Sequence, residues 1–190
     1  MSKAFVLILI HQILVQGMFL AKNAYLRRRI ELPIRGNNRE AMVATLFFVL
    51  FILASLALAA MDTPIATIPV ADDATLFSLA SVVLLISVVI GAATLVTMKD
   101  SWRVGVVKEQ TTPLITHGIF RYSRNPYFTS YMLMFAAYTI LLQNLILLVL
   151  SLINIGLIHW MVRREECYLS RVHHEIYRRY MERTPRYFLL

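Results

Sequence analysis

Charged residues and cysteine are both scarce in this chain of 190 residues. Only 16% of the residues are Asp, Glu, Lys or Arg, while 58% are hydrophobic; an ordinary soluble domain has about 25% charged residues. A soluble fold of this length has a large surface to cover with polar groups, and this sequence does not supply enough of them. The composition therefore excludes a soluble enzyme and a disordered chain. The single cysteine, Cys167, excludes an intramolecular disulfide framework and a paired-cysteine metal site.

Motifs of soluble nucleotide-binding enzymes are also missing. The chain contains no GxGxxG, Walker A, HExxH or GxSxG pattern, so a Rossmann cofactor site is not expected. His173 and His174 are adjacent and point to different faces of a helix, which makes them a poor metal pair, and no metal is expected. The formal charge of +8 suggests nucleic acid at first. In a chain this apolar, however, basic residues belong at the cytoplasmic face of a membrane, and no nucleic-acid partner is expected.

Apolar stretches predict an all-α integral membrane protein with five transmembrane helices. A helix needs about 20 apolar residues to cross a hydrocarbon core of about 30 Å, and the second and third stretches meet that length comfortably. The last two are short and separated only by Gln143-Asn144, which predicts a tight hairpin that crosses the membrane fully or enters it partway. A C-terminal helix from Arg163 to about Met181 follows, because apolar side chains recur there with helical spacing. The five stretches are Ala4–Ala21, Ala41–Met61, Ala74–Met98, Phe128–Leu142 and Leu145–Val162.

The connecting segments differ sharply in charge, and this predicts the orientation. Segments 22–39 and 99–124 and the tail after Val162 are rich in Lys and Arg, whereas segment 62–73 holds three aspartates and no basic residue. The positive-inside rule places the basic segments, and with them the C-terminal helix, in the cytoplasm. Within the first span, Gln12 and Gln16 share a helix face. We expect them to form hydrogen bonds between helices.

Two polar segments, Lys99–Tyr127 and Arg163–Arg186, flank the last hairpin. Because a hairpin brings its ends together, the two segments should meet at the cytoplasmic membrane surface and form a pocket with an apolar floor. Glu165 lies four residues before Leu169, on the apolar face of the C-terminal helix, and Glu166 lies one position round, toward solvent. A carboxylate at a buried edge is costly unless paired, so Glu165 would favour a cationic or amine-bearing partner. The alternative is that Glu165 only stabilises the start of the helix through the helix dipole.

The same two segments carry a family resemblance. The sequence LITHGIFRYSRNPYFTSY, followed after the predicted hairpin by EECYLSRVHHEIYRRYMERTPRYF, resembles the isoprenylcysteine carboxyl methyltransferase family of integral membrane methyltransferases. The resemblance covers about Trp102 to the C-terminus and implies an enzyme that uses S-adenosylmethionine, with a cytosolic cofactor site built without a Rossmann domain. The small prokaryotic members have five membrane helices, which implies the plasma or inner membrane of a prokaryote.

The resemblance also implies a division of the chain and a set of site residues. Residues 1–190 form a single membrane domain, with three membrane helices in 1–98 and the cofactor-binding methyltransferase core in 99–190. Glu165 stands at the acidic cofactor contact, where its carboxylate would meet the cationic amino group of the cofactor. The catalytic residue is not identified. The cofactor-binding residues implied by position are Pro113, Leu114, Ile115, Phe120, Asn125, Pro126, Tyr127, Phe128 and Glu165.

Departures from the family pattern leave the methyl acceptor open. Family members carry an Arg four residues before the acidic contact, associated with the substrate carboxylate, and this chain has Met161 there. Arg163 and Arg164 lie nearby and are expected to contact the substrate. The usual Phe-Gly of the tail helix is replaced by His173-His174. A prenylcysteine, a phospholipid amine, a thiol and another small lipophilic acceptor all remain possible, and membrane lipid is an expected partner.

Two other functions fit parts of the sequence. The run Ser101-Trp102-Arg103-Val104-Gly105 and the Arg-Asn-Pro loop resemble the core of the membrane sterol reductases, which implies an NADPH-dependent reductase, although those proteins usually have more spans. The other alternative is a non-catalytic membrane protein whose basic loops only bind anionic lipid headgroups. That function would not predict a carboxylate paired with a buried loop.

Overall fold

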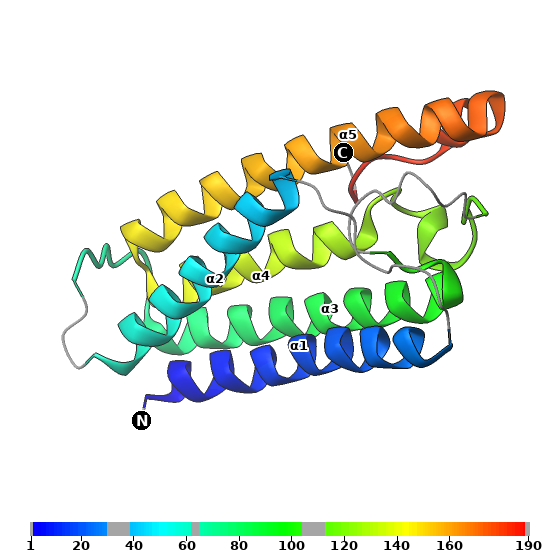
Figure 1. Ribbon diagram of the computed structural model, residues 1–190. Helices are drawn as coiled ribbons and strands as arrows, with labels where there is room; N and C mark the ends of the chain where they lie inside the picture. The colour runs from blue at the N-terminus through cyan, green and yellow to red at the C-terminus, as the bar shows by residue number, and fades with distance from the viewer. Residues whose placement is uncertain (1, 30–38, 62–64, 104–112, 189–190) are drawn as a thin grey trace.

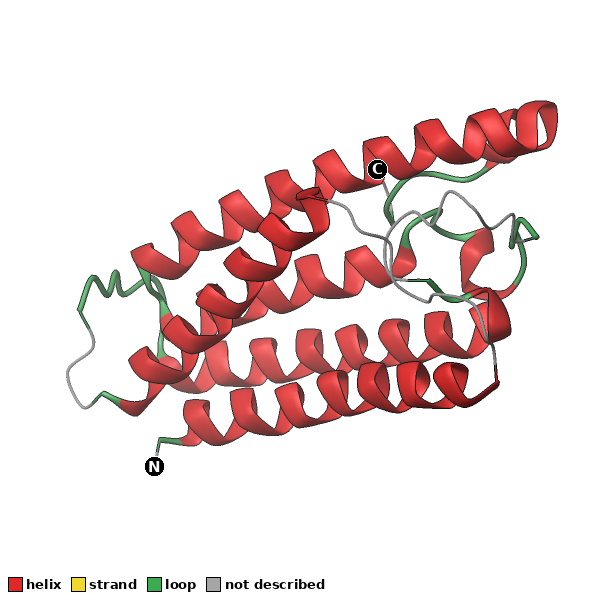
Figure 2. Ribbon diagram, in the orientation of Figure 1, coloured by secondary structure: helices red, strands yellow, loops and turns green. Residues whose placement is uncertain are grey.

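The chain folds into a bundle of α-helices (Figure 1). The computed structural model describes residues 2–29, 39–61, 65–103 and 113–188, and it shows no strand in these ranges (Figure 2), which confirms the all-α prediction. Three charged residues behind the predicted orientation, Arg35, Asp62 and Lys108, lie outside the described residues. The elements are α1 (Lys3–Arg29), α2 (Arg39–Ala60), α3 (Asp73–Met98), η1 (Lys99–Ser101), η2 (Gly118–Arg121), α4 (Pro126–Leu142) and α5 (Leu145–Arg183).

Four of the described helices, α1, α2, α3 and α5, are long and apolar enough to cross a membrane. The remaining helix, α4, has 17 residues. At a rise of 1.5 Å per residue it is about 25 Å long, which is somewhat shorter than a hydrocarbon core of about 30 Å. The five predicted membrane helices therefore correspond to four of full spanning length and one shorter helix, the first arm of the predicted hairpin.

The C-terminal helix expected from the sequence is not a separate element. α5 joins the last apolar stretch directly to the polar tail and runs without a loop from Leu145 to Arg183. Helical geometry is interrupted within it at His174, where φ is 46° and ψ is −123°. After Arg183 the chain reverses, and the tail returns along α5 toward the loop that precedes α4 (Figure 1).

The helices pack against one another in a defined arrangement. α3 packs on α4 and α1, α5 packs on α2 and α4, and α1 also contacts α2. The N-terminus, the loop before α3 and the turn between α4 and α5 lie at one end of the bundle (Figure 1). The loop before α4 and the C-terminal tail lie at the opposite end, so the two polar segments share one end as predicted.

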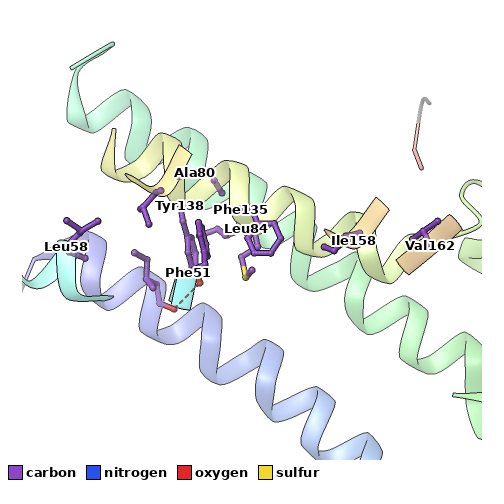
Figure 3. Packing of buried hydrophobic residues seen from close by; sticks show 13 residues of the cluster. Phe51, Leu58, Ala80, Leu84, Phe135, Tyr138, Ile158 and Val162 are labelled. Carbon is purple, nitrogen blue, oxygen red and sulfur yellow. Dashed lines mark hydrogen bonds between the residues drawn. The ribbon is translucent and has the colours of Figure 1, made fainter. Parts of the chain in front are cut away.

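Aromatic rings fill the centre of the bundle, where α2 meets α4 (Figure 3). The ring of Phe51 packs edge-on against Phe135, with 4.9 Å between centroids, and stacks on Tyr138 at 5.9 Å. None of the three side chains has exposed surface, and Leu84 and Ile158 add apolar contacts from α3 and α5. Close packing of this kind holds membrane helices together, because lipid offers apolar side chains almost as good an environment as the protein interior.

Hydrogen bonds join α1 to α4 inside this apolar core. Gln12 donates from Nε2 to the Tyr138 hydroxyl at 3.0 Å, and His11 Nδ1 shares a hydrogen bond of 2.8 Å with the same hydroxyl. Gln16 donates from Nε2 to Gln12 Oε1 at 3.3 Å. The expectation that Gln12 bonds across to a neighbouring helix is confirmed, whereas Gln16 bonds to Gln12 on its own helix.

The turn between α4 and α5 is held by the loop that precedes α3. Gln143 adopts the left-handed conformation, with φ and ψ both 45°. The side-chain oxygen of Asn144 then accepts from the backbone N–H groups of Ile146 at 3.0 Å and Leu147 at 3.3 Å. Its side-chain amide donates to the Ile65 carbonyl at 2.6 Å. One asparagine therefore caps α5 and fixes the adjacent loop.

We expect Asn144→Ala to lower the free energy of unfolding by about 1–2 kcal/mol, because loss of an N-cap costs about 0.5–2 kcal/mol and the bond to Ile65 is lost as well. Asn144→Ser keeps a capping oxygen and should retain most of the stability. Thermal unfolding of the detergent-purified protein measures both. An Asn144→Ser midpoint as low as that of Asn144→Ala would rule out the cap as the cause.

Candidate functional site

The C-terminal tail lies along the loop that precedes α4. We refer to residues 184–187 as the C-terminal strap. Within it, the carbonyl oxygen of Arg186 accepts hydrogen bonds from Ser123 Oγ at 3.1 Å and from Asn125 Nδ2 at 3.3 Å. Both donors are buried. The two polar segments predicted to meet at one end of the bundle are therefore in direct contact.

A cluster of charged side chains joins the loop and the strap to α5. The carboxylate of Glu166 on α5 accepts from Arg186 Nε at 3.1 and 3.0 Å and from Arg186 Nη2 at 2.8 Å. Arg124, in the loop before α4, places Nη1 at 3.2 Å from the same carboxylate. The side chains of Glu166 and Arg124 are only 9% and 10% exposed, so each needs a partner of opposite charge. Hydrogen bonding to Glu166 also raises the pKa of Arg186, which keeps its guanidinium charged.

The sequence analysis assigned the wrong environment to one of the two adjacent carboxylates. Glu166 was expected to face solvent, but it is 7% exposed and carries the ion cluster. Glu165 is half-buried and forms no hydrogen bond or ion pair with any residue in the described part of the chain. Two arginines from distant segments, and not only the apolar residues of the helix, determine which face of α5 turns inward.

The remaining residues expected to bind the cofactor gather at the same end of the bundle. Phe120 is buried in η2, and its carbonyl oxygen accepts from the Tyr180 hydroxyl at 2.7 Å. Pro126 occupies the first turn of α4, where proline loses no helical hydrogen bond. Residues 113–115 form an irregular segment ahead of η2 and are exposed or half-buried.

The arginines expected to contact the substrate, Arg163 and Arg164, are not among the described residues that line the cavity between the helices. Arg163 is exposed. Arg164 pairs with Glu40 at the start of α2 and lies over the ring of Trp160, with 5.8 Å to the centroid. Met161, which occupies the position of the family's arginine, does line a cavity. The structure therefore separates Arg163 and Arg164 from the pocket described next.

A cavity of about 200 Å³ lies between α1, α2, α4 and α5. Seven of its fifteen lining residues are aromatic, so it offers ring faces that attract cations. Pockets that enclose a whole drug-sized ligand measure about 300–1,000 Å³, so this cavity fits the reacting end of a ligand whose remainder lies outside. The lining residues are Gln16, Phe19, Ala41, Ala44, Thr45, Phe48, Trp102, Arg103, Tyr127, Phe128, Tyr131, Phe135, Asn154, Ile158 and Met161.

Tyr127 and Phe128 connect this pocket to the loop and strap, because they lie in the first turn of α4, which begins at Pro126 directly after Asn125. The sequence analysis identified these two residues but missed the walls that α1, α2 and the middle of α5 contribute. One signal was present, since Gln16 and Asn154 are polar residues within apolar spans, and such residues commonly mark a functional cavity.

Comparison with known families gives one match. A sequence profile described as phospholipid methyltransferase matches residues 75–176, which is more than half of the chain. The matched region begins in α3 and ends in α5, and it therefore includes the loop before α4, the pocket residues of α4 and α5, and Glu166. Among curated proteins, none matches the chain.

We expect Glu166→Ala to lower the free energy of unfolding by about 3–5 kcal/mol, because the buried guanidinium of Arg124 and the half-buried one of Arg186 lose the carboxylate that they share. Thermal unfolding should show this loss, and limited tryptic digestion should show faster cleavage in the C-terminal tail. Glu182→Ala is the matched control, since Glu182 lies on the same helix with 63% of its side chain exposed. Equal midpoints for the two variants would contradict the role of the cluster.

Proposed function

Because the chain belongs to the phospholipid methyltransferase family, we propose that it transfers a methyl group from S-adenosylmethionine to a small or lipophilic acceptor at the membrane. The observation that carries this proposal is the aromatic pocket, which borders the loop at the start of α4 on one side and helices of membrane-spanning length on the other. The proposed active site faces the cytoplasm, as the basic segments predict.

The proposed cofactor site is the end of the bundle that the strap closes. Half-buried Glu165 has no partner among the described residues and is suited to the cationic amino group of the cofactor. Residues 113–115, Phe120 and Asn125–Phe128 would border the rest of the molecule. The cofactor supplies a methyl group on a positively charged sulfur. The rings of Trp102 and Tyr127 favour a cation at the pocket wall and exclude water from it.

The acceptor would enter from the bilayer. The small side chains of Ala41 and Ala44 on α2 leave room beside Ile158 and Met161 of α5, so a lipid chain can remain in the membrane while its polar end enters the pocket. Among the described residues, the lining contains no carboxylate and no histidine. We therefore assign no general base within the pocket. In this proposal the protein accelerates transfer by holding nucleophile and methyl group in line and by keeping water out.

Detergent-purified protein should bind S-adenosylhomocysteine and should not bind NADPH. Isothermal titration calorimetry with each compound in turn distinguishes methyl transfer from the reductase that part of the sequence resembles. Binding of NADPH without S-adenosylhomocysteine would overturn the proposal. Binding of neither would favour a non-catalytic membrane protein.

Glu165→Gln should weaken S-adenosylhomocysteine binding by about tenfold or more, because hydrogen bonds to charged groups contribute about 1.5–3 kcal/mol. The thermal midpoint should stay close to that of the wild type, since Glu165 has no partner to lose in the described structure. Glu182→Gln is the control for removal of one acidic charge from α5. The assignment of Glu165 fails if both variants bind S-adenosylhomocysteine with the same affinity.

A further inference from the structure

The loop between α2 and α3 exposes apolar side chains. Its described part, residues 65–71, contains no charged residue, and Thr67 is its one polar side chain. Ile65, Ile68 and Val70 are between 51% and 73% exposed. A group of large apolar side chains on the surface marks a region that contacts a membrane or another molecule.

The backbone of this loop pairs with the turn between α4 and α5. The N–H of Ile68 donates to the Gln143 carbonyl at 2.8 Å, and the N–H of Leu145 donates to the Ala66 carbonyl at 3.0 Å. Loop and turn therefore satisfy polar groups of each other's backbone. Both lie at the end of the bundle opposite the C-terminal strap (Figure 1).

The side chain of Gln143 completes the pairing. Its Oε1 accepts from the backbone N–H groups of Val70 at 2.5 Å and Ala71 at 3.2 Å. Pro69 has no N–H, so each backbone N–H from Ile68 to Ala71 has an acceptor within the protein. A segment whose backbone donors are satisfied by protein can leave water, because it carries no unmet hydrogen bond into an apolar phase.

The length of α4 indicates how deep the turn lies. α4 has 17 residues and begins at Pro126, directly after the polar segment that holds Arg124 and Asn125. Its length of about 25 Å is about 5 Å less than a hydrocarbon core of about 30 Å. With the polar segment at one membrane surface, the turn after α4 ends within the opposite edge of the hydrocarbon. Irregular backbone is tolerated at this depth where protein satisfies it, as residues 65–71 do here.

Side chains of the adjoining helices continue the apolar surface of the loop. Met61, directly after α2, and Leu145, at the start of α5, are exposed, and Leu148 extends this surface along α5. Asp72 and Asp73 are exposed at the start of α3 and mark the limit of the surface, because a carboxylate without a partner remains in water. The exposed apolar part of the loop is therefore continuous with helices of membrane-spanning length and bounded by charge, which identifies lipid as the phase that covers it.

We propose that residues 65–71 form a membrane-inserted cap. Ile65, Ile68 and Val70 contact the acyl chains of the nearer leaflet, and the backbone of the cap shields the turn between α4 and α5 from those chains. The partner of this surface is the lipid bilayer and not a second protein. The inference is independent of the proposed function, because none of the residues of the cap lines the pocket.

The test uses the full-length chain, reconstituted alone into vesicles of palmitoyl-oleoyl phosphatidylcholine. Cys167→Ser removes the single native thiol, so that a nitroxide spin label can be attached at Val70→Cys or at Ile68→Cys. Power-saturation EPR then compares collisions of the label with molecular oxygen, which concentrates in hydrocarbon, and with a water-soluble nickel chelate. At both positions oxygen should collide more often than the chelate, as at Leu85→Cys on the exposed face of α3. At Glu182→Cys, exposed near the end of α5, the order should be reversed.

A second variant tests the contribution of the backbone pairing. Gln143→Leu removes the acceptor of the Val70 and Ala71 N–H groups, which then gain by returning to water. We expect collisions of the nickel chelate with the label at Val70→Cys to rise and the excess of oxygen collisions to shrink. The label at Leu85→Cys is the control and should not change. If Gln143→Leu does not fold, the labels beside the unaltered turn decide the result.

Two outcomes overturn the inference. More collisions with the nickel chelate than with oxygen, at either Val70→Cys or Ile68→Cys, would place the cap in water. Few collisions with either reagent would show that protein covers the cap, and in vesicles that hold this chain alone that protein is a second copy. An excess of oxygen collisions supports the cap, because lipid is then the only apolar phase in contact with the label.

Discussion

A carboxylate buried among arginines is the constraint on which the polar end of this protein depends. Glu166 stands on α5, Arg124 in the loop before α4 and Arg186 in the C-terminal strap, so one charge cluster joins three segments. Helices in lipid gain little from burying apolar surface against one another, and hydrogen bonds and close packing must hold them. Removal of Glu166 leaves the buried guanidinium of Arg124 without the carboxylate it faces, which costs more than the pair itself contributes. The cluster therefore fixes the loop that begins α4, and through it the wall of the pocket.

The N-terminal half contributes to the pocket as well as to the apolar core of the bundle. Gln12 and His11 bond to Tyr138 at the centre of the bundle, and the same side of α1 carries Gln16 to the pocket. An unpaired amide deep in an apolar bundle is costly, so each member of this chain restricts the orientation of the next. The polar pattern of α1 thus links the packing of the core to the chemistry available in the cavity.

Hydropathy and charge were sufficient to predict the five apolar helical stretches, their approximate limits and the polar end that they share. They did not predict that α1 continues to Arg29, because the basic residues were taken as its end. They predicted a helix in the tail from Arg163, but not that it continues α5 without a loop. The burial of Glu166 and the half-buried position of Glu165 could not be predicted from the sequence, since the inward face of α5 depends on Arg124 and Arg186 from distant segments. A pocket was predicted at this end, but the walls that α1, α2 and the middle of α5 contribute were missed, because the family resemblance covered only the C-terminal half.

The continuous helical stretch of α5 before His174 has a mechanical consequence. Asn154 lines the pocket and Glu166 anchors the strap, and twelve residues of one helix separate them, which is about 18 Å at 1.5 Å per residue. Because no loop intervenes, this stretch of α5 connects the pocket rigidly to the ion cluster. A tilt that widens the lipid side of the pocket also displaces the carboxylate under the strap. The tilt of α5 therefore couples the width of the pocket to the position of the strap.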